Sequence, residues 1–189
     1  MTQPKGWHSR GYLPHFDSPE TIQFVTYRLA DSLPRARIEA LRSLPDAVLL
    51  LDRELDAGLG ECWLRNAEIA SLAQESLLHF DGQRYRLLAW CVMPNHIHVV
   101  VEPIDGHALS AIVKSWKSFT SRQANMRLGR SGAFWEADYF DRYMRNEDHL
   151  MRTIEYVENN PVKASLVKEA ADWLWSSASY GARTSRSAS

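Results

Sequence analysis

Length and composition exclude several classes of protein. The chain has 189 residues, of which 45% are hydrophobic and 24% charged, and a chain of this kind can bury a core without disulfides. The N-terminus has no apolar run of signal-peptide length, and no stretch approaches the roughly 18 apolar residues of a membrane span. With only two cysteines, nothing requires an oxidising compartment. We therefore expect a cytoplasmic globular protein that has no membrane partner.

The charge is small in total but uneven along the chain. A net charge of −1 argues against a uniformly basic DNA-binding protein, because Lys and Arg supply the affinity for a phosphate backbone. The segment 114–130 nevertheless carries five basic residues and no acid, and the first sixteen residues carry Lys5 and Arg10 without an acid. A basic face and an ordinary solvated helix surface are equally good interpretations of the segment 114–130.

The first half of the chain predicts an arm, one strand and a run of helices. Residues 1–20 are rich in Gly, Pro and aromatic residues and are expected to form an extended N-terminal arm. Residues 22–29 are β-branched and aromatic, as in a strand. Apolar residues then recur at helical spacing over 35–56, where Pro45 is expected to divide the helix, and again over 66–79.

The middle of the chain predicts a buried antiparallel pair of strands. Residues 84–93 are mostly apolar, as in a strand covered on both faces. The dipeptide Pro94-Asn95 makes a tight turn into a returning strand over 96–102. Leu109, Ile112, Val113, Trp116 and Phe119 then follow helical spacing and predict a helix over 108–126.

The last elements complete the fold class. We expect a strand over 138–144 and a helix over 147–159. Pro161 is expected to end this helix or to follow its last turn. The order of elements predicts an α+β fold with a ferredoxin-like split βαβ, an antiparallel sheet and helices mainly on one face. We expect one domain over 1–180 and a disordered tail over 181–189.

The stretch WCVMPNHIHVVVEP carries the most informative pattern. Side chains alternate between the faces of a strand, so His96 and His98 lie on one face, and Ile97, Val99 and Val101 form an apolar opposite face. Two imidazoles one strand repeat apart can bind a single divalent metal ion. Taken alone, His-x-His is a weak pattern, because surface or hydrogen-bonded histidines have the same spacing.

The stretch IEYVENNPVKASLV carries a second pattern. Helical spacing places Asn160 one turn after Tyr156 on the same side, where its amide oxygen is a candidate third metal ligand. A tyrosine nucleophile needs help because its ordinary pKa is about 10, and a metal that withdraws charge from a phosphate would supply it. From the residues alone, a half-buried helix aromatic explains Tyr156 better, since it is one of seven tyrosines.

Three motifs in order resemble a known family. They are PNHIHVVVEP, FWEADYFDRYMRNEDHL and EYVENNPVKASLV, preceded by SRGYLPHFD and QFVTYRLADSLP. Together they resemble the HUH single-tyrosine transposases, and most closely the REP-associated tyrosine transposases, which are domesticated relatives of insertion-sequence transposases. The likeness spans roughly residues 6 to 180. Three ordered motifs are far more specific than His-x-His alone.

The resemblance implies a metal-dependent endonuclease and strand transferase for single-stranded DNA. His96 and His98 would hold Mg²⁺ or Mn²⁺, and Tyr156 would attack a phosphate to give a 5′-phosphotyrosine link and a free 3′-hydroxyl. Insertion-sequence relatives often carry Gln one turn after the tyrosine, whereas Asn160 is one methylene shorter, which leaves the third ligand open. The targets would be palindromic repeats that form hairpins with a flanking single strand. The protein would be bacterial and nucleoid-associated, acting as a monomer or homodimer.

Six further residues are candidates for DNA contacts. Those on the arm are equally well interpreted as stacking on flanking bases or as packing, and those on the helix would hold hairpin phosphates. The candidates are Trp7, Arg10 and Tyr12 on the arm and Lys114, Lys117 and Arg122 on the helix.

Two other functions remain open at this point. One is a non-catalytic module that binds DNA or RNA hairpins on the same fold. The other is an unrelated metal hydrolase built on His-x-His, which would need a further carboxylate or histidine. Glu102 is an even number of residues from His98 and therefore shares its face of the strand.

Overall fold

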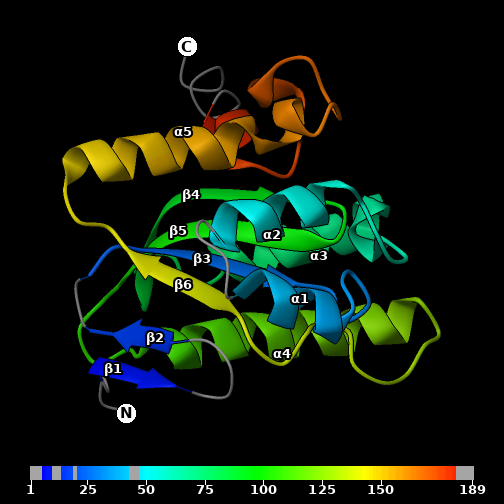
Figure 1. The fold of residues 1–189 in the computed structure, drawn as a ribbon, viewed down its shortest axis with the longest axis horizontal. Coiled ribbons are helices and arrows are strands. Elements are labelled where there is room, and N and C mark those ends of the chain that lie inside the picture. The colour runs from blue at the N-terminus through cyan, green and yellow to red at the C-terminus, as the bar shows by residue number, and fades with distance from the viewer. Residues whose placement is uncertain (1–5, 10–13, 19–20, 43–46, 182–189) are drawn as a thin grey trace.

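A four-stranded antiparallel sheet forms the centre of the protein (Figure 1). The computed structural model describes residues 6–9, 14–18, 21–42 and 47–181. Neighbouring strands are all antiparallel and stand in the order β4-β5-β3-β6. Their bounds are β3 Gln23–Arg28, β4 Tyr85–Val92, β5 His96–Pro103 and β6 Phe140–Tyr143. This is a ferredoxin-like split βαβ arrangement, so the predicted fold class is confirmed.

Five α-helices accompany the strands in the described part of the chain. They are α1 Arg35–Arg42, α2 Ala47–Asp56, α3 Ala67–Leu78, α4 Leu109–Arg127 and α5 Glu147–Lys163. Asn66 caps α3 by accepting from the Glu68 and Ile69 amides, and Asn146 caps α5 by accepting from the His149 amide. Pro45 lies outside the described residues, between α1 and α2.

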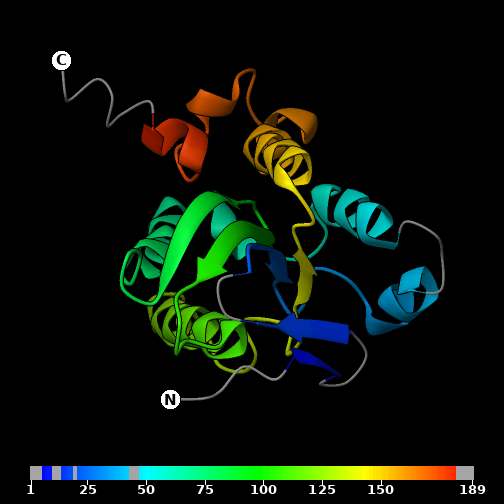
Figure 2. The same cartoon turned by 90° about the vertical axis from the view of Figure 1, so that its left-hand side faces the viewer.

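Helices cover both faces of the sheet (Figure 2). The helices α3 and α4 pack against each other and share the larger hydrophobic core with Ile97, Val99 and Val101. On the opposite face, α5 packs against β4 and β5. The sequence predicted helices mainly on one face of the sheet. This holds for α3 and α4, but α5, which carries Tyr156, covers the other face.

Shorter elements complete the described structure. Strands β1 (Gly6–Ser9) and β2 (Pro14–Asp17) form an antiparallel pair, and β2 lies against β6, so the expected extended arm contains a hairpin. Two short 3₁₀ helices, η1 (Trp63–Arg65) and η2 (Ala170–Asp172), lie before α3 and after α5. No helix in the described ranges is long and apolar enough to span a membrane. Residues 182–189, which are most of the expected tail, lie outside the described residues.

The last helix is longer than the sequence predicts. Pro161 lies inside α5, which continues to Lys163. A proline in a helix removes one hydrogen bond, but Pro161 is buried and close to the helix end, where the Ala164 amide bonds to Asn160 and the Leu166 amide to Pro161. This extension keeps Asn160 on the same helix as Tyr156, one turn later.

Candidate active site

His96 and His98 lie side by side in the middle of the molecule. Both side chains are fully buried on the α5 face of β5, and their Nε2 atoms are 3.0 Å apart. Phe24 on β3 stacks on the His98 ring, with ring centroids 5.4 Å apart. Ile97 points into the α3–α4 core on the other face. The strand alternation expected from the sequence is therefore confirmed.

Asn95 fixes the tautomer of His96. Its Nδ2 donates to the carbonyl oxygens of Leu55 and Leu59, both at 3.0 Å, so its Oδ1 faces the ring, 2.8 Å from His96 Nδ1. Because a carbonyl oxygen only accepts, Nδ1 carries the hydrogen, and Nε2 of a neutral His96 keeps its lone pair. Burial lowers the pKa of His96 to about 3, so the ring is neutral near pH 7.

Thr26 orients the second imidazole. Its Oγ1 lies 2.8 Å from His98 Nδ1, and the two residues stand opposite each other in the β3–β5 register. Burial, and then the nearby His96 and Lys163, lower the pKa of His98 well below its ordinary value. Both rings are therefore neutral, which is the form of imidazole that binds metal ions.

The donor spacing fits one octahedral ion. Two ligands at right angles, each about 2.1 Å from such an ion, lie about 3 Å apart, as the two Nε2 atoms do. Asn160 is fully buried, with its Nδ2 3.4 Å from His98 Nε2 and with no partner for its Oδ1 in the described structure. A half-turn of this amide would direct the oxygen toward His98, so the chain offers two nitrogens and one amide oxygen.

The carboxylate near the histidines is Asp56, whereas Glu102, the candidate of the metal-hydrolase hypothesis, is paired elsewhere. Glu102 pairs with Arg86 on β4 at 2.6 Å, which accounts for its charge. Asp56, on α2, has its Oδ1 3.8 Å from His96 Nε2 and without a hydrogen-bond partner in the described structure. Among the described residues, no group of three or more His, Cys, Asp or Glu side chains is arranged to hold a metal. Other coordination positions would be left open, as in catalytic rather than structural metal sites.

Tyr156 reaches the histidines from α5. Its ring centroid is 5.8 Å from that of His98, and the Lys163 ammonium lies 4.2 Å from the ring centre. Its hydroxyl donates to Asp52 Oδ2 at 2.7 Å. Burial, followed by the charge of Asp52, raises the pKa of Tyr156 above its ordinary value. The structure thus brings Tyr156, His98 and Asn160 together, as the sequence predicts.

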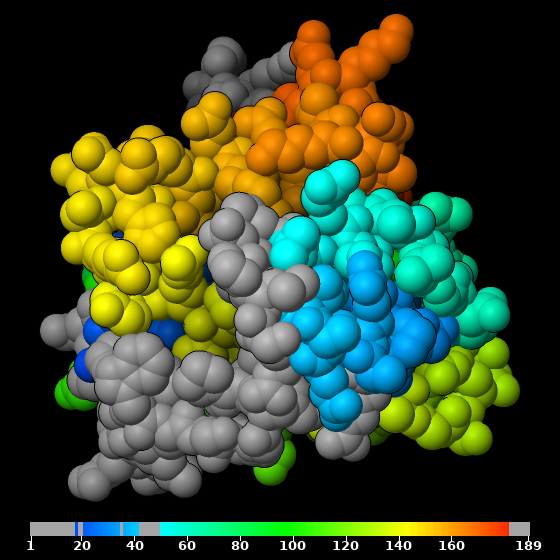
Figure 3. Space-filling view, in the orientation of Figure 1, coloured from blue at the N-terminus to red at the C-terminus, as the bar shows by residue number. Residues whose placement is uncertain are grey.

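Asp52 is the residue that the sequence analysis missed. It is 3% exposed and lies on α2, and Figure 3 shows the surface of α2 (cyan) adjoining that of α5 (yellow to orange). The pKa of Asp52 is raised to about 7: burial is the main cause, the hydrogen bond from Tyr156 lowers it, Asp56 raises it and Lys163 lowers it. The one signal in the sequence is that Asp52 and Asp56 are four residues apart, on one side of a helix.

A small cationic cavity opens beside Tyr156. Its volume is about 130 Å³, and its walls include Asp52, Tyr156, Arg142, His149 and Arg152. Burial and the neighbouring arginines lower the pKa of His149. The guanidinium groups of Arg142 and Arg152 are exposed and form no hydrogen bond or ion pair with described residues. They are therefore available to an anion that approaches the tyrosine.

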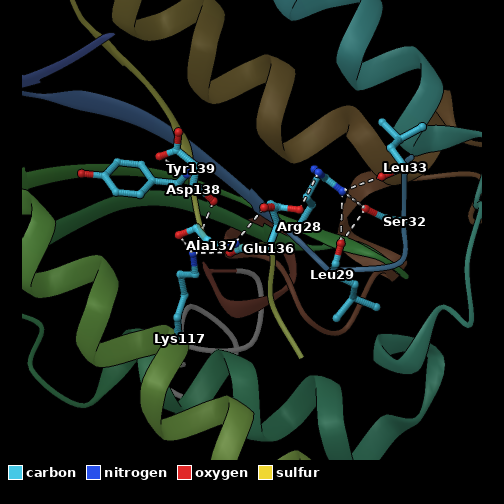
Figure 4. Close-up of polar contacts among 9 residues, drawn as sticks. All are labelled: Arg28, Leu29, Ser32, Leu33, Lys117, Glu136, Ala137, Asp138 and Tyr139. Carbon is cyan, nitrogen blue, oxygen red and sulfur yellow. Dashed lines mark hydrogen bonds and ion pairs between the residues drawn. The ribbon is translucent and has the colours of Figure 1, made fainter. Parts of the chain in front are cut away.

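The residues expected to contact DNA lie apart from this cavity. Lys114 and Arg122 are exposed on α4, on the other side of the sheet. Lys117 donates to the carbonyl oxygens of residues 136–138 at 2.6, 2.8 and 3.3 Å, and burial lowers its pKa to about 8. This ammonium therefore anchors the segment before β6, which Arg28 also holds through Glu136 (Figure 4).

The arm residues are only partly described. Trp7 lies on β1, the outer hairpin, and its backbone alone is described. Arg10 and Tyr12 lie outside the described residues. The DNA contacts expected of all six candidates stay predictions.

Comparison with protein families identifies the segment that carries the site. A family model described as "Transposase IS200 like" matches residues 68–160. Residues 68–160 belong to the IS200-like transposase family. This transposase segment contains both histidines, Tyr156 and Asn160, whereas α1 and α2, with Asp52, lie outside it. The resemblance seen in the sequence is therefore confirmed.

Two curated relatives extend the match. A Haemophilus influenzae protein named as a REP-associated tyrosine transposase is 23% identical over 120 residues, or 58% of this chain and 66% of the relative. The REP-associated tyrosine transposase of Escherichia coli K12 is 25% identical over 92 residues, or 49% of this chain and 53% of the relative. The match thus covers less than two thirds of either relative.

A solved structure matches most of the chain. It is described as a REP-associated tyrosine transposase bound to a REP hairpin and has a TM-score of 0.60 and 18% sequence identity. The match covers 88% of this chain and 81% of that chain. At this identity the likeness shows the fold.

Proposed function

We propose that this IS200-like transposase is a metal-dependent endonuclease and strand transferase for single-stranded DNA that acts on hairpin-forming repeats. The observation that carries the proposal is the convergence of two neutral imidazole Nε2 atoms, 3.0 Å apart, beside the Tyr156 ring. The two Nε2 atoms face one point, and a nucleophilic hydroxyl is held on the adjoining helix. A binding protein without catalysis would not need this arrangement.

His96, His98 and Asn160 would hold a divalent ion, Mg²⁺ or Mn²⁺. When bound, the ion would withdraw charge from the phosphate oxygens. Asn95 and Thr26 keep the two rings oriented, so that Nε2 rather than Nδ1 faces the ion. His96, His98 and Asn160 are fully buried, and this burial would limit the access of bulk water to the reacting phosphate.

Tyr156 would be the nucleophile. Its Oη would form a bond to the scissile phosphorus while the bond from phosphorus to the 3′-oxygen breaks, leaving a 5′-phosphotyrosine link and a free 3′-hydroxyl. Attack of a 3′-hydroxyl on the same link would rejoin strands without another energy source. Because cutting and joining are the same step in opposite directions, one site serves both.

The substrate would be a hairpin with a flanking single strand. The solved relative is described as bound to a REP hairpin, which supports this class of DNA for the present chain. We place the phosphates of the flanking strand in the cationic cavity, against Arg142 and Arg152, since neither is paired with a described residue and both lie beside Tyr156. The protein would then act at the bacterial chromosome, as a monomer or as a homodimer.

The decisive test is capture of the covalent link. End-labelled hairpin DNA from the host's own repeats is incubated with Mn²⁺ or Mg²⁺ and run on a denaturing gel. We expect a protein–DNA adduct that is absent with Tyr156→Phe and in EDTA. Tight hairpin binding without adduct or cleavage would instead assign a binding module.

A further inference from the structure

The helix that touches the nucleophile comes from outside the segment matched to the family. The IS200-like match begins at residue 68, whereas α2 ends at Asp56. Asp52 on α2 nevertheless accepts the hydroxyl hydrogen of Tyr156 at 2.7 Å, across 104 positions of sequence. This contact directly involves the atom that would attack phosphorus.

We propose that Asp52 is a catalytic residue that takes the proton of the Tyr156 hydroxyl during attack and returns it when the strands are rejoined. This inference rests on the proposed function. It assigns the proton acceptor for the reaction to a helix that lies outside the matched segment.

The surroundings of Asp52 favour proton transfer over a purely structural role. Its carboxylate is 3% exposed, and its Oδ1 has no hydrogen-bond partner in the described structure. A buried carboxylate without a bonded cation is costly for stability. A neutral side chain such as Asn would accept the same hydrogen bond from Tyr156 at lower cost. The hydrogen bond alone therefore does not explain why this position carries a carboxylate, whereas proton transfer does.

The charged groups around Asp52 are compatible with this use. Asp56 lies one turn further along α2, and Lys163 approaches from α5. Arg142, His149 and Arg152 share the adjoining cavity with it. Burial brings the pKa of Asp52 to about 7, and a general base is most effective when its pKa lies near the working pH.

The step balances without any further reactant. As the bond from Tyr156 Oη to phosphorus forms, the hydroxyl proton moves to Asp52 Oδ2. The bond from phosphorus to the 3′-oxygen breaks, and that oxygen takes a proton from water. In the joining direction a 3′-hydroxyl attacks, its proton goes to water, and Asp52 gives its proton back to the departing Oη.

The test measures the rate of adduct formation by full-length wild type, Asp52→Asn and Glu155→Gln from pH 5.5 to 9. Asn keeps an acceptor for the Tyr156 hydroxyl but cannot take the proton. Glu155→Gln is the matched control, because it removes one carboxylate from an exposed position next to Tyr156 in sequence. Hairpin binding in EDTA verifies that each variant folds and recognises the DNA.

At pH 8 we expect Asp52→Asn to form the adduct about 100-fold more slowly or worse, and Glu155→Gln to match wild type. The wild-type rate should rise with pH through about 7, the pKa of Asp52, because the carboxylate must be ionised to accept a proton. This rise should be missing from the residual rate of Asp52→Asn. A structural role alone would not remove it.

A sulfur-substituted substrate decides which proton Asp52 moves. With sulfur in place of the bridging 3′-oxygen, the leaving group needs no proton, so the defect of Asp52→Asn should persist. Relief of the defect would overturn the proposal in favour of donation to the leaving group. Equal or faster adduct formation by Asp52→Asn on the normal substrate also overturns it, while leaving the proposed function intact. If the wild-type protein forms no adduct, the proposed function is wrong, and the role proposed for Asp52 is wrong with it.

Discussion

The α3–α4 face of the sheet and its α5 face differ in what they bury. On the α3–α4 face, large apolar side chains pack together and most polar groups are paired. Trp116 Nε1 donates to Tyr85 Oη at 2.9 Å, and Tyr85 Oη donates to the Leu77 carbonyl at 2.7 Å. The Tyr27 hydroxyl is an exception, since it is buried without a partner in the described structure.

On the α5 face the apolar cluster is smaller, and buried polar groups gather around Tyr156. Two imidazoles face each other, and three side-chain oxygens lack partners among the described residues. These oxygens are Asp52 Oδ1, Asp56 Oδ1 and Asn160 Oδ1. Buried groups of this kind reduce stability, so one face of the same sheet holds the fold together and the other is shaped for a reaction. Variants on the two faces should therefore separate activity from stability.

The largest expected effect comes from the α5 face and concerns the metal. His98→Ala removes one of two converging nitrogens, so we expect Mn²⁺ binding and adduct formation to fall below detection. Binding is measured by the loss of the free Mn²⁺ signal in electron paramagnetic resonance. His79→Ala makes the same change on the exposed end of α3 and should bind Mn²⁺ like wild type. Mn²⁺ binding by His98→Ala at wild-type affinity would exclude this metal centre.

The corresponding change on the α3–α4 face should affect stability alone. Trp116 is 1% exposed and packs on Tyr27 and Tyr85, so Trp116→Ala should lower the free energy of unfolding by about 3–5 kcal/mol. Urea denaturation measures this loss. The adduct rate per folded molecule should stay near that of wild type at low temperature. A specific loss of the chemical step would mean that the two faces are coupled.

Asp52→Asn should make the protein more stable while making it less active. The pKa of Asp52 is raised from 3.8 to about 7 in the folded state, so its contribution to stability is present below pH 3.8 and is lost as pH rises through 7. At pH 8 the neutral Asn avoids this loss, and the gain is at most about 4 kcal/mol. Thermal unfolding should show a higher Tm for Asp52→Asn at pH 8 and nearly equal values below pH 4. A lower Tm at pH 8 would contradict the cost assigned to this carboxylate.

The part of the site that depends on local geometry was predictable from sequence. Strand alternation puts His96 and His98 on one face whatever surrounds them, and helical spacing puts Asn160 one turn after Tyr156. The tight turn at Pro94-Asn95 likewise set the antiparallel pair of β4 and β5. These features need only the repeat of one element.

Features that depend on packing between distant elements were not predictable. Asp52 contacts Tyr156 only because α2 lies against α5, and in sequence its carboxylate resembles the solvated acids around it. Lys117 lies in a basic segment that suggests DNA binding, yet its ammonium donates hydrogen bonds to three backbone carbonyl oxygens. Pro161 continues its helix because burial at the helix end compensates for one missing hydrogen bond.

The smallest expected effect tests which face meets the DNA strand. Arg142→Gln with Arg152→Gln should weaken binding to the flanking single strand about tenfold and reduce its salt dependence by roughly 1 to 1.5 in log–log slope. Lys114→Gln with Arg122→Gln removes the same charge from the opposite face and should have the smaller effect. Fluorescence anisotropy with a labelled hairpin at several salt concentrations measures both pairs. The cations of the cavity lie beside Tyr156, where the strand that is cut would have to pass. If the α4 pair had the larger effect on the flanking strand, the DNA would have to cross the stable face of the sheet, and the division between the two faces would fail.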